Sequence, residues 1–140
     1  MARENQISNE TTHRGTWRQL GVSFDAAVAR LPEALQAEGF GVITQIDMQQ
    51  TLKAKLGVDF RRYRIFGACN PKLALEALQV DPRVGLLLPC NIVLFETDER
   101  TAVLGVIDPV QQLGGPDGPL GHVARNIGEK LARVASQLDA

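Results

Sequence analysis

The sequence is poor in several kinds of residue, and each shortage argues against a class of protein. Only two of its 140 residues are cysteine, too few for a disulfide-stapled scaffold. No apolar run approaches the roughly 20 residues that span a bilayer. The formal net charge is −1, so there is no bulk attraction to nucleic acid or to an acidic membrane. Aromatic residues make up 5%, so the core must be built mainly from Val, Leu, Ile and Ala.

What is present fits one globular domain. Hydrophobic residues make up 44% and charged residues 22% of the chain, close to the average for folded domains of this length. Residues 1–15 are polar and contain no hydrophobic segment of the kind that a secretory signal needs. We expect them to form a flexible arm, followed by a single domain over residues 16–140. We also expect a cytoplasmic location, reduced cysteines and no cofactor.

Local signals predict where the helices begin and end. Ser23 is a predicted N-cap for a helix that starts at Phe24, Asp47 for a short helix that ends at Gly57, and Asn70 for a helix with Pro71 in its first position. A long amphipathic helix is predicted over residues 120–138. Pro32 interrupts the first helix, where its missing N–H predicts a kink or a break.

Strands are predicted by alternating or continuous apolar runs at residues 16–23, 40–47, 60–69, 91–97 and 101–108. The apolar stretch at residues 81–89 and the Gly/Pro-rich stretch at residues 109–119 predict irregular structure. Clustered strands flanked by helices favour the α+β class over alternating βαβ units. We therefore expect a largely antiparallel sheet packed against a first helix and a long C-terminal helix, with short helices inserted between strands.

Four blocks between Gly39 and Pro109 resemble a bacterial and archaeal family of unknown function, DUF302. The blocks are "GFGVITQID", "TLKAKLGVDFRRYRIFGACNPKLALEAL", "GLLLPCNIVLFE" and "AVLGVIDP". The resemblance implies the element order β-α-β(4)-α and a fold similar to half of the TATA-binding protein. It implies no activity, and likeness to a DNA-binding fold does not transfer function.

The two cysteines have the same neighbours, because each is followed by an asparagine and lies close to a proline. In an antiparallel sheet Cys69 ends one strand and Cys90 begins the next, so both emerge at the same end of that sheet. We therefore expect a binding site formed by Cys69, Asn70, Cys90 and Asn91.

Several chemistries are open to this pair. The start of the helix after Cys69 would favour a thiolate nucleophile, with His122 or His13 as the only histidine bases. The pair could form a redox disulfide. Metal binding would need further ligands, such as His122 and Asp108, or a second subunit. The favoured interpretation is that both thiols are packed as small hydrophobic side chains.

Two charged residues are further candidates for the site. Asp47 ends a predicted strand, although its role as a helix cap accounts for it, and Arg64 belongs to a small basic cluster on the next strand. We predict a module that binds a small ligand or a protein partner, with a homodimer as one such partner and no nucleic acid or membrane. The alternatives are a thiol-dependent enzyme or redox protein using Cys69 with Cys90, and metal binding by the two cysteines. Whether the protein is an enzyme stays open.

Overall fold

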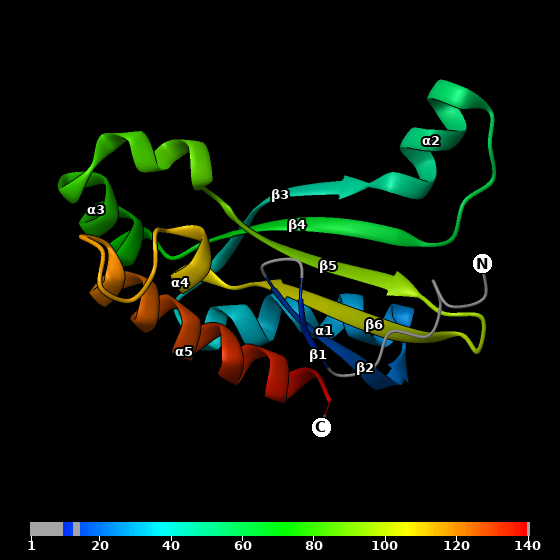
Figure 1. Ribbon diagram of the computed structural model, residues 1–140. Coiled ribbons are helices and arrows are strands. Elements are labelled where there is room, and N and C mark those ends of the chain that lie inside the picture. The colour runs from blue at the N-terminus through cyan, green and yellow to red at the C-terminus, as the bar shows by residue number, and fades with distance from the viewer. Residues whose placement is uncertain (1–9, 13–14, 140) are drawn as a thin grey trace.

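One antiparallel sheet carries the strands of the computed structural model, which describes residues 10–12 and 15–139 (Figure 1). The strands lie in the order β1-β2-β6-β5-β4-β3. Their bounds are β1 Glu10–Thr12, β2 Gly15–Ser23, β3 Gly41–Asp47, β4 Tyr63–Cys69, β5 Cys90–Glu96 and β6 Thr101–Ile107. The helices are α1 Phe24–Ala37, α2 Met48–Leu56, α3 Pro71–Val80, the 3-10 helix η2 Pro82–Leu87, α4 Pro109–Gln112 and α5 Gly121–Leu138.

The element order confirms the predicted fold class. Apart from β1 and the short inserted helices, the chain runs strand, helix, four strands, helix. Helices α1 and α5 pack against each other and cover one face of the sheet (Figure 1). Between them and the sheet lies the core, whose largest fully buried side chains are Phe24, Phe66, Leu20, Leu31, Leu35, Ile92, Leu94, Leu104 and Leu131.

The predicted helix caps are confirmed. The side chain of Ser23 accepts a hydrogen bond from the N–H of Ala26, Asp47 from that of Gln50, and Asn70 from that of Leu73. These bonds satisfy N–H groups that have no partner inside the first turn of a helix. Local chemistry therefore fixes where α1, α2 and α3 begin.

Two local predictions were wrong, and of the kink or break expected at Pro32 the break is absent. Helix α1 continues through Pro32 without a break, because the residues around the proline, Leu31, Ala34 and Leu35, are buried against the core and tertiary packing outweighs the lost hydrogen bond. Residues 82–87 form a 3-10 helix, and residues 109–112 form the short helix α4 under an Asp108 cap.

The two faces of the sheet differ in what covers them. On β4 the side chains of Phe66 and Ala68 point into the helix-covered core and are 1% exposed. The alternate residues of β4, Tyr63, Ile65, Gly67 and Cys69, belong to the opposite face. On that face Tyr63 stacks on Phe95 of β5, with ring centroids 5.5 Å apart. The candidate site lies at the ends of β4 and β5, where residues of both faces, such as Ala68 and Cys69, come together.

The expected arm over residues 1–15 lies mostly outside the described residues, although Glu10–Thr12 form β1 beside β2. Among the helices that the structure describes, no segment combines the length and the apolar character needed to cross a membrane.

Candidate functional site

The register of β4 and β5 brings the two cysteine-bearing strand ends together. Ala68 lies opposite Cys90, and Gly67 lies opposite Asn91. Helix α3 and η2 form the excursion between the two strands. A cavity of about 220 Å³ lies where they meet. It is lined by Phe40, Ile43, Ala68, Cys69, Asn70, Ala74, Ala77, Leu88, Pro89, Cys90 and Ile127.

The lining of this cavity is almost entirely apolar. Its main polar side chain is that of Asn70, and both ends of its amide already have partners. Nδ2 donates to the carbonyl of Glu38 at 3.2 Å, and Oδ1 accepts from the N–H of Leu73 at 3.3 Å. Asn70 therefore ties the end of α1 to the start of α3 and forms a wall of the cavity. The cavity suits an apolar group, since few polar groups are left to bind a polar one.

Both cysteines are free thiols, but their surroundings differ. Cys90 is 7% exposed and belongs to the core, whereas Cys69 is partly exposed. Burial, with a smaller contribution from nearby Cys69, raises the pKa of Cys90 to about 11. Cys90 is therefore a protonated, apolar wall group at neutral pH and not a nucleophile. No disulfide joins the two cysteines, so a redox disulfide pair has no support here.

Gly67 allows the strand ends to pack closely beside the cavity. A Cβ atom at this position would lie 2.1 Å from Oγ1 of Thr44 and 2.6 Å from Cγ of Pro89. Thr44 is the register partner of Gly67 on β3, and Pro89 lines the cavity. A side chain on residue 67 would push the Pro89 wall away from β4.

Asp47 and Arg64 lie far from the cysteines. They face each other across β3 and β4, with Nη2 of Arg64 4.0 Å from Oδ2 of Asp47. Arg64 and Cys69 are five residues apart on one strand, which is about 17 Å. The pair neighbours a second charged group, in which Arg62 contacts Asp25. Asp47 and Arg64 thus form part of the charged border at the start of β4 and do not line the cavity.

Asn91 is exposed on the face of the sheet opposite α1 and α5, where it is the register partner of Gly67. It is not among the residues that line the cavity, although it lies one residue beyond Cys90. The structure therefore places three predicted site residues, Cys69, Asn70 and Cys90, around one space, and leaves Asn91 at its edge.

The remaining cavity residues were not predicted from the sequence. Ala74 and Ala77 lie three residues apart on the apolar stripe of α3, where their small side chains leave space under the helix. The sequence offered one signal for this part of the cavity, which was a pair of alanines at this spacing in the helix that follows a predicted strand end. Ile43 and Ile127 come from β3 and α5, and only the tertiary structure brings them to the cavity.

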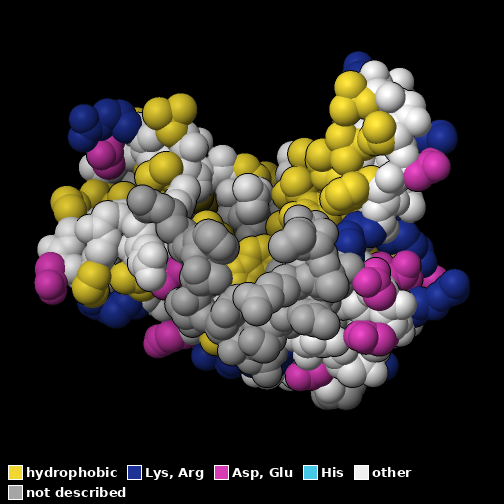
Figure 2. Space-filling model, turned by 45° about the vertical axis from the view of Figure 1, so that its right-hand side comes forward, with side chains coloured by type: hydrophobic (Ala, Val, Ile, Leu, Met, Phe, Trp, Pro, Cys, Tyr) yellow, Lys and Arg dark blue, Asp and Glu magenta, His cyan; other side chains and the backbone are white. Residues whose placement is uncertain are grey.

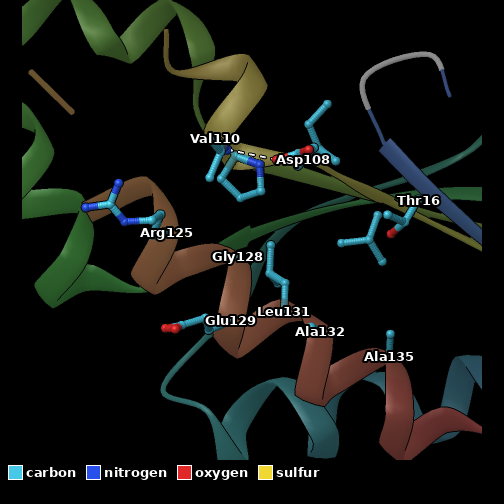
Figure 3. Close-up of a pocket in the computed structure, with 12 residues that line it drawn as sticks. Thr16, Asp108, Val110, Arg125, Gly128, Glu129, Leu131, Ala132 and Ala135 are labelled. Atoms are coloured by element: carbon cyan, nitrogen blue, oxygen red, sulfur yellow. Dashed lines mark hydrogen bonds between the residues drawn. The ribbon is translucent and has the colours of Figure 1, made fainter. Parts of the chain in front are cut away.

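A second, larger depression of about 440 Å³ lies between α5, α4 and the ends of β2 and β6 (Figure 3). Two of its polar side chains already have partners, because Asp108 caps α4 through the N–H of Val110 and Arg125 donates to the carbonyl of Pro116. In Figure 3 the charged ends of Arg125 and Glu129 point away from the space above Leu131. The depression therefore offers no group of side chains that converge on a ligand.

Metal binding finds no ligand set in the described part of the chain. No group of three His, Cys, Asp or Glu side chains there could hold a metal ion. His122 is an exposed residue in the first turn of α5, and His13 lies outside the described residues. Within the described residues of one copy, the two cysteines have no further ligands of the kind that a zinc site requires.

Comparison with known proteins identifies the family. A family model described as a domain of unknown function, DUF302, matches residues 17–138. The chain belongs to the DUF302 family. No curated protein matches it. The crystal structure of an uncharacterized conserved DUF302 protein from Bacillus stearothermophilus is similar, with 29% sequence identity and a TM-score of 0.81 over 90% of this chain and 98% of that chain. The DUF302 fold predicted from the four sequence blocks is thereby confirmed.

Proposed function

We propose that this DUF302 domain is a binding module whose site is the apolar cavity at the ends of β4 and β5. The observation that carries the proposal is the cavity itself, which is lined by Cys69, Cys90 and apolar side chains from β3, α3 and α5. Concave, mostly apolar spaces of this kind are the usual places where proteins bind small molecules.

The size of the cavity limits the ligand. A dry cavity of about 150 Å³ accepts benzene, whereas pockets for whole drug-sized ligands begin near 300 Å³. A space of about 220 Å³ therefore takes an apolar group of one or two rings, or a short acyl chain. The rest of the ligand, or the protein that carries the group, would lie outside the cavity beside Cys69.

Protection of Cys69 from alkylation tests the proposal. The apolar dye 1-anilinonaphthalene-8-sulfonate would be titrated into the native protein while iodoacetamide labelling of Cys69 is followed by mass spectrometry. We expect the dye to slow the labelling in a saturable way. Labelling rates that do not change at dye saturation would refute a ligand site at this cavity.

Two leucine substitutions provide a matched pair for this test. Ala74→Leu adds three carbon atoms to the lining of the cavity, whereas Ala132→Leu makes the same change at the larger depression beside α5. We expect Ala74→Leu to weaken the protection by about tenfold, since it fills the space that an apolar group of similar size would occupy. Ala132→Leu should leave the protection unchanged.

A thiol-dependent activity of Cys69 is the second candidate. It is supported by the position of Cys69, which is partly exposed, lines the cavity and directly precedes the cap of α3. The start of a helix stabilises anions. The same alkylation experiment without dye separates the candidates. Labelling of Cys69 at pH 7 that is much faster than that of free cysteine supports thiol chemistry, and slower labelling supports the binding module alone.

A further inference from the structure

Strand β3 is an exposed edge whose protection against pairing is confined to a bulge between Val42 and Thr44. Among the described strands its only neighbour is β4. From Gly41 to Ile46 it contains neither a charged residue nor a proline, which are the usual features that keep a bare edge from pairing with another chain. Ile43 and Ile46 on this strand are 61% and 46% exposed. The edge therefore presents backbone hydrogen-bonding groups and apolar side chains together.

An apolar arm continues from the end of this strand. It consists of α2 and residues 57–60, and it carries the exposed side chains Leu56, Val58 and Phe60. No residue of α2 is buried. Figure 2 shows hydrophobic side chains gathered over α2 and the neighbouring sheet edge, at the upper right of the molecule.

Contacts hold the two parts of the arm together, and one contact joins the arm to β4, although the arm buries little of its own surface. The ring of Phe60 lies against that of Tyr63, with centroids 6.1 Å apart. Nε2 of Gln49 donates to the carbonyl of Phe60, and Nζ of Lys53 lies 2.9 Å from Oδ1 of Asp59. A preorganised apolar surface of this kind loses little conformational freedom when it is covered.

We propose that a second copy of this chain covers the edge and the arm, through antiparallel pairing of β3 with β3 about a two-fold axis. Such a dimer uses the same surface on both copies. This surface is complementary to itself because Ile43 lies near one end of β3 and the apolar arm follows the other end. A two-fold axis through the strand brings the arm of each copy toward Ile43 of the other.

The two faces of the sheet restrict the register of this pairing. A bulge between Val42 and Thr44 leaves residues 44–47 as the regular part of the edge. Thr44 and Ile46 oppose Gly67 and Ile65 and so lie on the face opposite α1 and α5. Among the registers that keep like faces together, the proposed one pairs Thr44 of one copy with Ile46 of the other and places Gln45 on the axis. Asp47 then lies opposite Ile43 of the other copy.

The arrangement relates the dimer to the cavity. Because α2 begins at Met48, the arm of each copy starts beside Ile43 of the other, and Ile43 lines the cavity. The second copy thus covers the side of the cavity that β3 forms.

The surface offers apolar area and compensated charges for such a dimer. The side chains of Ile43, Ile46, Leu56, Val58 and Phe60 are 42–69% exposed on each copy. Specific interfaces typically bury about 1,200–2,000 Å² in total, so each copy would contribute about 600–1,000 Å² from these side chains, the edge backbone and neighbouring polar groups. Asp47 and Lys53 face Arg64 and Asp59 within each copy, so like charges at the interface are already compensated.

Sedimentation equilibrium with two charged variants tests the proposal. We expect the protein to have the mass of a dimer at micromolar concentrations. Ile46→Lys, and separately Ile43→Asp, should raise the dissociation constant of the dimer by about a hundredfold. The first places an unpaired charge in the interface, and the second places a carboxylate opposite Asp47 of the other copy, where like charges repel. Ile46 does not line the cavity, so that variant tests the dimer apart from the binding site. Circular dichroism confirms that both variants fold.

Leu86→Lys is the matched control. Leu86 is 91% exposed on η2, outside the proposed interface, and its replacement should leave the dimer intact. A monomer at all concentrations, a dimer that both β3 variants retain, or a dimer that Leu86→Lys dissociates would each overturn the proposal. A monomer that instead captures an extended peptide at β3 would likewise exclude a second copy as the occupant.

Oxidative cross-linking tests the register. Gln45→Cys places two new thiols on the two-fold axis, where directly opposite residues have Cβ atoms about 4.5–5.5 Å apart. We expect mild oxidation to link the two copies of this variant much faster than those of Gln79→Cys, an exposed position on α3, or of the unaltered chain. Equal rates for the two variants would overturn the register.

Discussion

Cys90 lies directly opposite Ala68 in the ladder between β4 and β5, so that the next residue of β4, Cys69, reaches the same end of the sheet. The two thiols line one cavity, yet only Cys69 is partly exposed. One strand end thus supplies a group that solvent can reach, and the other supplies a buried wall. The two thiols are therefore expected to differ in reactivity, although their neighbours in the sequence are similar.

The buried thiol predicts a dependence of stability on pH. The pKa of Cys90 is raised to about 11 in the folded protein, whereas an unfolded cysteine ionises near 8.5. Between these values the unfolded chain loses the proton and the folded chain keeps it. Stability that is fully present below pH 8.5 is therefore lost as the pH rises toward 11, by up to about 3 kcal/mol.

Urea denaturation at pH 7.5 and pH 10.5 measures this loss. The Cys90→Ala variant is less stable at both values because it removes a buried side chain. It should nevertheless lose less stability between the two pH values than the unaltered protein does. The same loss in both proteins would show that Cys90 does not carry the raised pKa.

The fold was largely predictable because its signals are local. Ser23, Asp47 and Asn70 cap helices through their own side chains, and such bonds depend on a few neighbouring residues. The break at Pro32 was wrong because burial of the surrounding helix depends on residues far away in the sequence. Helix α4 was missed although Asp108 and Pro109 repeat the pattern of Asn70 and Pro71.

The candidate site was predictable only in part. Antiparallel strand order brought Cys69 and Cys90 to one end of the sheet, as expected. The same strand order places Asp47 and Arg64 at the other end of β3 and β4. The direction of the strands was therefore enough to predict that these two residues lie away from the cysteines. The exposure of Ile43 and the position of Ile127 were beyond the sequence, since both depend on how distant elements pack.

Asn70 is expected to act through stability. Asn70→Ala removes both the cap of α3 and the bond to the carbonyl of Glu38, and should destabilise the protein by about 1–2 kcal/mol. Asn70→Asp retains an acceptor for the N–H of Leu73, but it places a carboxylate oxygen against the carbonyl of Glu38, so it should destabilise the protein as well. Asn91→Ala, at an exposed position, should change the stability by less than about 0.5 kcal/mol. Chemical denaturation measures the free energy of unfolding of the three variants. An Asn70→Ala variant as stable as the unaltered protein would contradict the structural role of Asn70.

Gly67 gives the sharpest test of how β3, β4 and Pro89 pack. In Gly67→Ala the new methyl group would overlap Oγ1 of Thr44 and the ring of Pro89, and such crowding typically destabilises a protein by about 1–3 kcal/mol. Gly41→Ala is the matched control, because a Cβ there meets no atom within 4 Å. Adding Thr44→Ala to Gly67→Ala should restore part of the lost stability, since it removes one of the two overlaps. Thermal unfolding of the four proteins measures this, and equal melting temperatures for Gly67→Ala and Gly41→Ala would mean that the strand ends are packed less tightly than described.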